Sequence, residues 1–112
     1  RMIAIMSDFS SDEFKDDIQH KIDRIDKIDI LVNNAGINKI DNFVDTKSED
    51  FEKIMNVNLK SPYEISKIVS RKMIKNKYGR IVNISSIFGK LSCTTTNLII
   101  FFNYRYLVAF FG

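Results

Sequence analysis

The stretch Asp29-Ile-Leu-Val-Asn-Asn-Ala-Gly36 is a short apolar run that ends abruptly in a polar turn. A second run of the same kind, Arg80-Ile-Val-Asn-Ile-Ser85, follows after a long helical pattern. Short apolar runs that alternate with amphipathic helices are typical of parallel strands joined by crossover helices. These two stretches therefore predict an α/β fold with a parallel sheet.

The residues before and between these runs complete a β-α-β-α-β order. Met2-Ile-Ala-Ile-Met6 predicts a first strand, and apolar side chains recur at helical intervals over 14–25. The spacing of Ser10–Glu13 is that of a capping box at the start of this helix. A long helix over 48–77, ended by Gly79, leads to the last strand. Together these elements predict a parallel sheet with right-handed crossovers.

The composition excludes several classes of function. The chain has 112 residues, of which 45% are hydrophobic, and this length sets a limit of one domain. One cysteine cannot form an intramolecular disulfide, and one cysteine with one histidine is too few for a zinc site. The 17 basic residues are interleaved with 14 acidic ones, so no nucleic-acid partner is expected. With no signal-peptide pattern, we expect a cytoplasmic protein without a metal site or membrane partner.

Polar residues follow each of the three predicted strands. They are Ser7-Asp8, Asn33-Asn34-Ala35-Gly36 and Ser85-Ser86. Ligands of open parallel sheets bind beyond the carboxyl ends of the strands. Ordinary turn chemistry explains any one of these clusters, but three of them at one edge indicate a binding site.

Asn58 is a second signal of function. It lies four residues after Ile54 and seven after Phe51, and thus on the apolar side of the predicted helix. Pro62 has no N–H to donate to the carbonyl of Asn58, so we expect a kink there. The kink would present a free carbonyl and an amide toward the sheet edge. Asn58 is then either a structural residue that satisfies the kink or an acceptor for an ordered water.

Three motifs resemble those of the short-chain dehydrogenase/reductase family, in particular its classical members typified by 3-oxoacyl-acyl-carrier-protein reductase. The motifs are Asp29–Gly36, Met55-Asn-Val-Asn-Leu59 and Gly79-Arg-Ile-Val-Asn-Ile-Ser-Ser-Ile-Phe-Gly89. They occur in the family's order at compatible spacings. The resemblance implies that residues 1–92 are the central part of a Rossmann-type dehydrogenase domain that lacks the first βαβ unit. Residues 93–112 are then a divergent hydrophobic tail.

The resemblance also implies an NAD(P) cofactor and residues that bind it. Asp8 matches the acidic residue that touches the adenine ring in the family. Asn33, Ala35 and Gly36 match the segment that stabilises the central sheet and lines the cofactor. Whether the cofactor is NADP or NAD depends on a strand that this sequence does not contain.

Two catalytic residues are implied by the same resemblance. Asn58 matches the helix residue whose carbonyl holds a water of a proton relay. Ser86 matches the serine that hydrogen-bonds the substrate carbonyl, with Ser85 as the alternative if the register differs by one. The implied reaction moves a hydride between the nicotinamide and a carbonyl or secondary alcohol, carried on a small molecule or on an acyl carrier.

The chain departs from the family pattern at both ends. It has no glycine-rich turn for the pyrophosphate. The expected Tyr-x-x-x-Lys falls on Ile99 and Asn103, and no lysine follows Lys90. We therefore expect these 112 residues alone to be inactive, and we interpret the segment from Cys93 onward as a frameshifted, misspliced or degraded ending. Its apolar stretch over 98–111 is either a misfitted tail or a membrane-associating segment, too short to span a bilayer.

Two other interpretations compete with the enzymatic one. The chain could be an inactive truncated relative that acts at most as an interaction module through helix 48–77, the element that would also join subunits of a homo-oligomer. It could also be a different doubly wound protein, such as a flavodoxin-like binding domain. The three motifs favour the dehydrogenase family over the latter.

Overall fold

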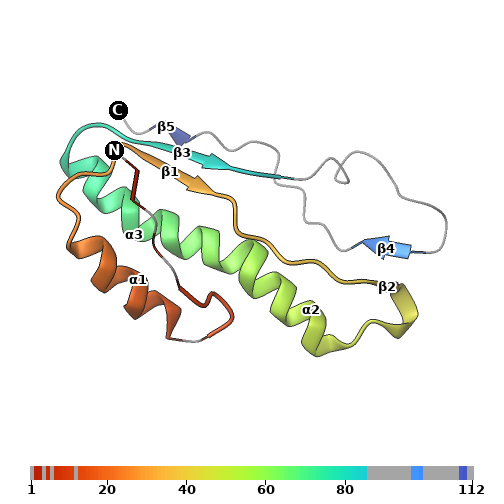
Figure 1. Ribbon diagram of the computed structural model, residues 1–112. Coiled ribbons are helices and arrows are strands. Elements are labelled where there is room, and N and C mark those ends of the chain that lie inside the picture. Colours follow the sequence, from red (N-terminus) through yellow and green to blue (C-terminus); the bar gives the residue numbers. More distant parts are fainter. Residues whose placement is uncertain are drawn as a thin grey trace.

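A layer of strands lies over a layer of helices (Figure 1). The computed structural model describes residues 2, 3, 5, 7–11, 13–85, 97–99 and 109–110, so Ser86 and most of the predicted tail lie outside the described residues. The helices are α1 (Phe14–Asp23), α2 (Ser48–Met55) and α3 (Ser61–Lys75), and the strands are β1 (Ile30–Asn33), β2 (Ile40–Asn42), β3 (Arg80–Asn83), β4 (Asn97–Ile99) and β5 (Ala109–Phe110). Short non-α turns occur at Phe43–Asp45, a 3-10 helix, and at Asn56–Lys60, a π-helix.

The main sheet contains the parallel pair that the sequence predicts. β1 and β3 run parallel, with a register from Ile30 opposite Arg80 to Asn33 opposite Asn83. β5 adds to the other side of β3 in the antiparallel direction, which gives the order β1-β3-β5. A separate antiparallel pair joins β2 to β4. The α/β class and the parallel arrangement are therefore confirmed, in a sheet that is only partial.

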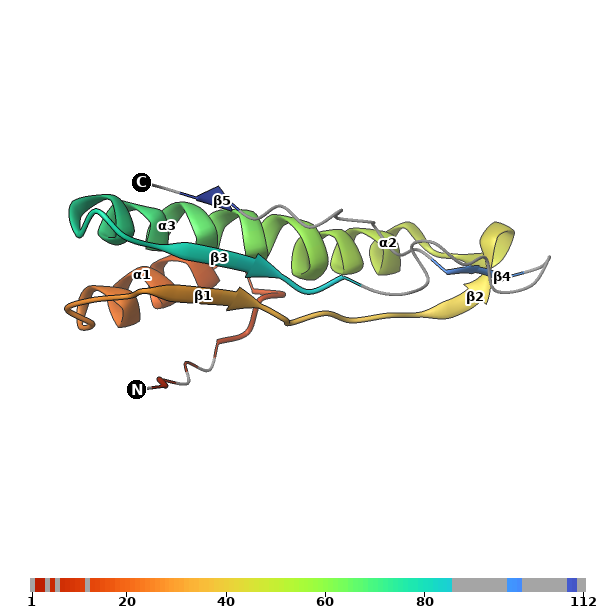
Figure 2. The same ribbon diagram turned by 90° about the horizontal axis from the view of Figure 1, so that it is seen from above.

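The hydrophobic core lies between the sheet and the paired helices α1 and α3. Figure 2 shows both helices on the same side of β1 and β3. Met73 and Val69 of α3 are fully buried, and the apolar face of α1 and Ile81 of β3 complete the cluster. Two lysines also join the helices: Lys15 pairs with Glu64 at 2.8 Å, and the ammonium of Lys72 caps carbonyls at the end of α1.

The predicted first strand is not formed in the described residues 2, 3 and 5. In a doubly wound sheet of order 3-2-1-4-5-6, the strand that leads into the first helix of this chain is the third, whose neighbour is the second strand. That neighbour is not present in the described part of the chain. An apolar segment without a hydrogen-bonding partner cannot become a strand, because strand conformation depends on the ladder.

The beginning of α1 also differs from the predicted capping box. The helix begins at Phe14, and Glu13 occupies its N-cap without a capping hydrogen bond from its own side chain. The N–H of Glu13 donates to the hydroxyl of Ser11 at 3.2 Å. The hydroxyl of Ser10 donates instead to the Asp8 carboxylate at 2.6 Å. In the turn that precedes the helix, the Asp8 carboxylate is thus the hydrogen-bond acceptor. The predicted role of Ser10 as the capping residue of the helix is wrong.

The predicted helix 48–77 is a composite of α2, a π-helical turn and α3. We call the π-helical segment Asn56–Lys60 the π-turn. The expected kink is realised in this form because Pro62 cannot donate to Asn58, and the N–H of Ser61 bonds Asn56 five residues earlier. One extra residue is thereby accommodated without an interruption of the helix.

Lys77, not Gly79, supplies the left-handed residue that ends this helix. Lys77 has φ 56°, whereas the two glycines among the described residues, Gly36 and Gly79, have no positive φ. The N–H of Tyr78 donates to Met73 at 3.1 Å and that of Lys77 to Ile74 at 3.0 Å, which is the Schellman arrangement. Gly79 is needed for a different reason: a Cβ there would lie 2.4 Å from the buried Met73 side chain.

Candidate active site

The carboxyl ends of β1 and β3 are joined by a network of side-chain amides and a hydroxyl. The Nδ2 group of Asn33 donates to Asn83 Oδ1 at 2.7 Å and to Ser66 Oγ at 3.0 Å. Ser66 belongs to α3, so the network ties both strands to the helix beneath them. Both N–H groups of the Asn33 side chain are thus used within the protein.

Asn58 holds the segment that leaves β1. Its Oδ1 accepts from the backbone N–H of Ile37 at 2.8 Å, and its Nδ2 donates to the carbonyl of Ile37, also at 2.8 Å. The side-chain amide, which the kink was expected to present toward the sheet edge, closes a two-bond ring with the backbone beside Gly36. The π-turn aims the side chain at the sheet edge, and Pro62 leaves the Asn58 carbonyl without the usual i+4 donor.

Asp8 lies in the exposed turn before α1. Its Oδ1 accepts from the N–H of Ser10 at 2.9 Å and from the Ser10 hydroxyl at 2.6 Å. These bonds from the Ser10 side chain and backbone lower the pKa of the Asp8 carboxyl. In the described part of the chain no hydrogen bond reaches its Oδ2, so this ionised oxygen can accept from a ligand.

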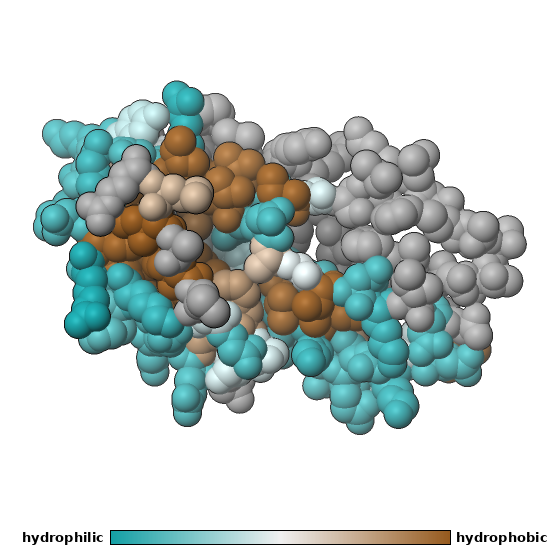
Figure 3. All heavy atoms as spheres, viewed as in Figure 1, coloured by the Kyte–Doolittle hydropathy of each residue, from teal (hydrophilic) through white to brown (hydrophobic). Residues whose placement is uncertain are grey.

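A cavity of about 510 Å³ opens where the polar clusters meet the apolar face. Its walls come from the N-terminal segment, α1, β1 and the π-turn, and include Phe9, Asn33, Ala35, Val57 and Ser61. Figure 3 shows apolar surface gathered around the N-terminal segment. Of the predicted site residues, Asn33 and Ala35 line the cavity, Gly36 and Asn58 each follow directly on a lining residue, and Asp8 directly precedes one.

The predicted catalytic serine, Ser86, lies outside the described residues, and Ser85 is exposed at the carboxyl end of β3. The N–H of Ile84 donates to the carbonyl of Asn33 at 2.9 Å, so the parallel ladder continues toward Ser85. The roles of both serines stay predictions. In the described part of the chain no group of histidine, cysteine, aspartate or glutamate side chains is suited to hold a metal.

Sequence analysis missed three residues that build this edge: Ser61, Ser66 and Asn83. A signal existed for Ser61, because it lies three residues after Asn58 and four before Ile65 on the buried side of the helix. The sequence also contained a signal for Asn83, because it is a side-chain amide within an apolar strand. Ser66 had none, since a serine in an amphipathic helix is ordinarily solvated.

Comparisons with known proteins agree with this arrangement. The family profile described as short chain dehydrogenase matches residues 1–97. The chain is 44% identical over 75 residues to the 3-oxoacyl-[acyl-carrier-protein] reductase FabG of Rickettsia conorii, a match over 67% of this chain and 31% of that protein. It is 40% identical over 78 residues to FabG of Thermotoga maritima, over 70% and 32% of the two chains.

Solved structures with NADP bound share the fold. ElxO has a TM-score of 0.67 with 38% identity, over 78% of this chain and 36% of its own. A 3-oxoacyl-(acyl-carrier-protein) reductase from Agrobacterium tumefaciens C58 has a TM-score of 0.67 with 29% identity, over 74% and 32%. The chain thus spans about a third of the length of these relatives.

A parallel sheet whose carboxyl edge is held by Asn33 and Asn58, together with these matches, defines the class. The chain belongs to the short-chain dehydrogenase family, whose members are oxidoreductases. In the part of the chain that the structure describes, no helix is long and apolar enough to cross a membrane.

Proposed function

We propose that this chain is the central part of an NAD(P)-dependent oxidoreductase that reduces a carbonyl or oxidises a secondary alcohol. The observation that carries the proposal is the meeting of three elements around one cavity: the Phe9 turn, the end of β1 and the π-turn. In a parallel sheet this edge is where a nucleotide binds. The dinucleotide would supply the hydride chemistry, and the protein would position it.

The residues at this edge fit a dinucleotide. Asp8 offers a free carboxylate oxygen suited to the exocyclic amine of adenine. A Cβ at Gly36 would meet only Asn58 Oδ1 at 3.6 Å, an ordinary contact, so packing within the described chain does not require glycine there. Bare backbone at this position leaves room for the close approach of a ligand.

Asn58 and Ser86 are the residues we assign to catalysis. With its side chain bound to Ile37, Asn58 would act through its carbonyl, which can hold a water because Pro62 donates nothing to it. Ser86 would donate from its hydroxyl to the substrate oxygen as negative charge develops there. The similarity to FabG proteins supports a 3-oxoacyl group on an acyl carrier as the substrate.

We expect the 112 residues alone to show no turnover, because they contain neither the glycine-rich turn nor Tyr-x-x-x-Lys. The first measurement is NADPH oxidation at 340 nm with a 3-oxoacyl thioester, with no rate above background expected. Turnover by this chain alone would contradict the proposal that catalysis requires the glycine-rich turn and the Tyr-x-x-x-Lys motif.

A chimera tests the assigned residues themselves. Residues 7–92 would replace the corresponding segment of the Thermotoga maritima reductase, which contributes the remaining parts. We expect an active chimera, in which Ser86→Ala lowers kcat by about 100-fold or more. The matched control is Ser85→Ala, with a small effect. If Ser85→Ala causes the large loss instead, the register shifts by one, and an inactive but folded chimera would contradict the proposal.

A second candidate function is an interaction module on the composite helix, without catalysis. Tyr63 and Ile74 are each 60% exposed and lie eleven residues apart, so they share one outward face of α3. This face would join subunits of a homo-oligomer. Sedimentation velocity of the chain and of Tyr63→Glu decides the matter: a concentration-dependent dimer that the variant abolishes supports it, and a monomer in both contradicts it.

A further inference from the structure

The most deeply buried polar side chain of the described residues is that of Ser61, which is 1% exposed. A buried hydroxyl is costly unless it is hydrogen-bonded, so its partners indicate its role. Ser61 has a single hydroxyl hydrogen, which is shared between the carbonyl of Asn56, 2.7 Å from Oγ, and the carbonyl of Phe9, 3.3 Å from Oγ. The first partner is in the π-turn, and the second is 52 residues away in the N-terminal segment.

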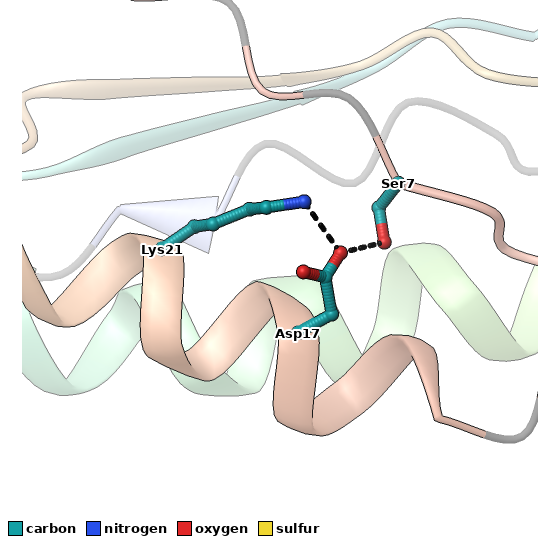
Figure 4. A network of polar contacts seen from close by, with 3 residues as sticks. All are labelled: Ser7, Asp17 and Lys21. Carbon is teal, nitrogen blue, oxygen red and sulfur yellow. Dashed lines mark hydrogen bonds and ion pairs between the residues drawn. The ribbon is translucent and has the colours of Figure 1, made fainter.

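The contact with Phe9 matters because of what surrounds that residue. Ser7 Oγ donates to Asp17 Oδ2 at 2.6 Å, which fastens the same segment to α1, and the ammonium of Lys21 donates to the same oxygen at 2.6 Å (Figure 4). The Phe9 ring packs edge-on against Phe14, with centroids 6.1 Å apart. Asp8 lies between Ser7 and Phe9, so these tethers fix its backbone from both sides.

The π-turn is attached at its other side to the exit of β1. Asn58 bonds the backbone of Ile37 there, while Ser61, at the end of the same turn, reaches Phe9. The N–H of Ser61 also donates to the Asn56 carbonyl, so the residue is held in place by its backbone as well as its hydroxyl. The π-turn and the first residue of α3 therefore bond Ile37 and Phe9, the residues that directly follow two of the three polar clusters.

We propose that Ser61 is a positioning residue, which sets the place of Asp8 relative to Asn58 through the carbonyl of Phe9. The inference rests on the proposed function, in which Asp8 binds the adenine end of a dinucleotide and Asn58 lies at its reacting end. The distance between these two residues then has to match the length of that ligand. A serine suits this position because its small side chain fits a closed site and still donates a hydrogen bond to a neighbouring segment.

The test uses the full chain, labelled with ¹³C and ¹⁵N, and adenosine 5′-monophosphate as the probe. Ser61→Ala is expected to shift the ¹³C resonance of the Phe9 carbonyl and to weaken binding of the probe by about 3- to 10-fold, the loss of one hydrogen bond. Ser61→Thr, which keeps the hydroxyl, should restore both. Should Ser61→Ala fail to fold, Ser61→Cys keeps the volume with a weaker donor and is measured in the same way.

Ser70→Ala is the matched control. Ser70 Oγ also bonds a backbone carbonyl of the helix, that of Ser66 at 2.6 Å, but it reaches no other segment among the described residues. It should leave the Phe9 resonance and the probe affinity unchanged. Equal effects of Ser61→Ala and Ser70→Ala would overturn the inference. Failure of the unmodified chain to bind the probe would overturn the adenine assignment of Asp8, and the Phe9 resonance would still decide whether Ser61 holds that segment.

Discussion

The helix-covered face of the sheet and the outer side of β1 contain similar apolar residues in very different surroundings. Met73 and Val69 under the sheet are 0% exposed, whereas Ile30 and Val32 on β1 are 57% and 53% exposed. Leu31, between them, packs against the core, so the two exposed residues lie on the face turned away from the helices.

The difference comes from which neighbours each surface has. Strands of a parallel sheet are ordinarily buried on both faces and paired on both edges. Here α1 and α3 cover one face, and β1 pairs only with β3 among the described residues. The outer side of β1 therefore has the apolar composition of a buried surface but is exposed. The edge of β1 can also pair with strands of other chains.

The largest expected effect concerns the covered face. Met73→Ala should destabilise the fold by about 2–5 kcal/mol, because it leaves a cavity among fully packed side chains. Val32→Ala on the open face should change stability by only about 0.5 kcal/mol. Urea unfolding followed by circular dichroism measures both. Similar losses in the two variants would mean that β1 is covered in solution, for example by self-association.

Gly79 offers a second test of how tightly the covered face is packed. Gly79→Ala should cost about 1–3 kcal/mol, since its Cβ would lie 2.4 Å from Met73. Gly36→Ala is the control, because its Cβ meets only Asn58 Oδ1 at 3.6 Å, and stability should hardly change. The same urea titrations apply. A neutral Gly79→Ala would show that Met73 repacks freely and that this side is looser than its burial indicates.

The end of α3 should allow a gain in stability. Lys77 has φ 56°, a conformation that costs a residue with a Cβ about 1–2 kcal/mol. Glycine avoids this cost and loses about 0.5–1 kcal/mol in chain entropy, so Lys77→Gly should stabilise by about 0.5–1 kcal/mol. Lys75→Gly, two residues earlier and inside the helix, should instead destabilise by about 1 kcal/mol. Thermal melts of both variants would show opposite shifts.

The smallest effect concerns the tether of the N-terminal segment and depends on pH. Hydrogen bonds from Lys21 and then from Ser7 lower the pKa of Asp17. The unfolded chain therefore binds this proton more readily, and the contribution of Asp17 is complete above about pH 4 and lost as the pH falls further. Asp17→Asn should lower the melting temperature slightly at pH 6, with a difference that shrinks toward pH 3. Asp16→Asn, which removes an exposed carboxylate from the same helix, is the control for the loss of one negative charge.

Much of the fold followed from local pattern. The apolar periods of Phe14, Ile18 and Ile22 predicted the buried face of α1, and the short runs at β1 and β3 predicted a parallel pair. Those signals can be recognised locally, because the spacing of apolar residues indicates which side of a helix or strand is buried. Pro62 likewise predicted a disturbance of the long helix, since a missing N–H acts within one turn.

Other features depended on contacts between distant segments. The apolar run 2–6 has the composition of a strand, but a strand needs a neighbour, and the described chain offers it none. Gly79 was predicted to end the helix. Glycine is required at this position because the Met73 side chain packs against it, and only the tertiary structure brings these two residues together. The amide of Asn58 was expected to face the sheet edge, but the sequence did not identify its partner Ile37, 21 residues away in the chain.

The sequence by itself thus determined the succession of α1, β1, the long helix and β3 and the buried faces of the helices, and it predicted that Asp8, Asn33 and Asn58 lie toward one edge. Period and turn chemistry act over a few residues, so they can be read along the chain. Only the tertiary structure decided that Ser61 bonds Phe9, that Asn33 bonds Asn83 and Ser66, and that one side of β1 is open. A hydrogen bond across tens of residues depends on how layers pack, and no local pattern encodes that distance.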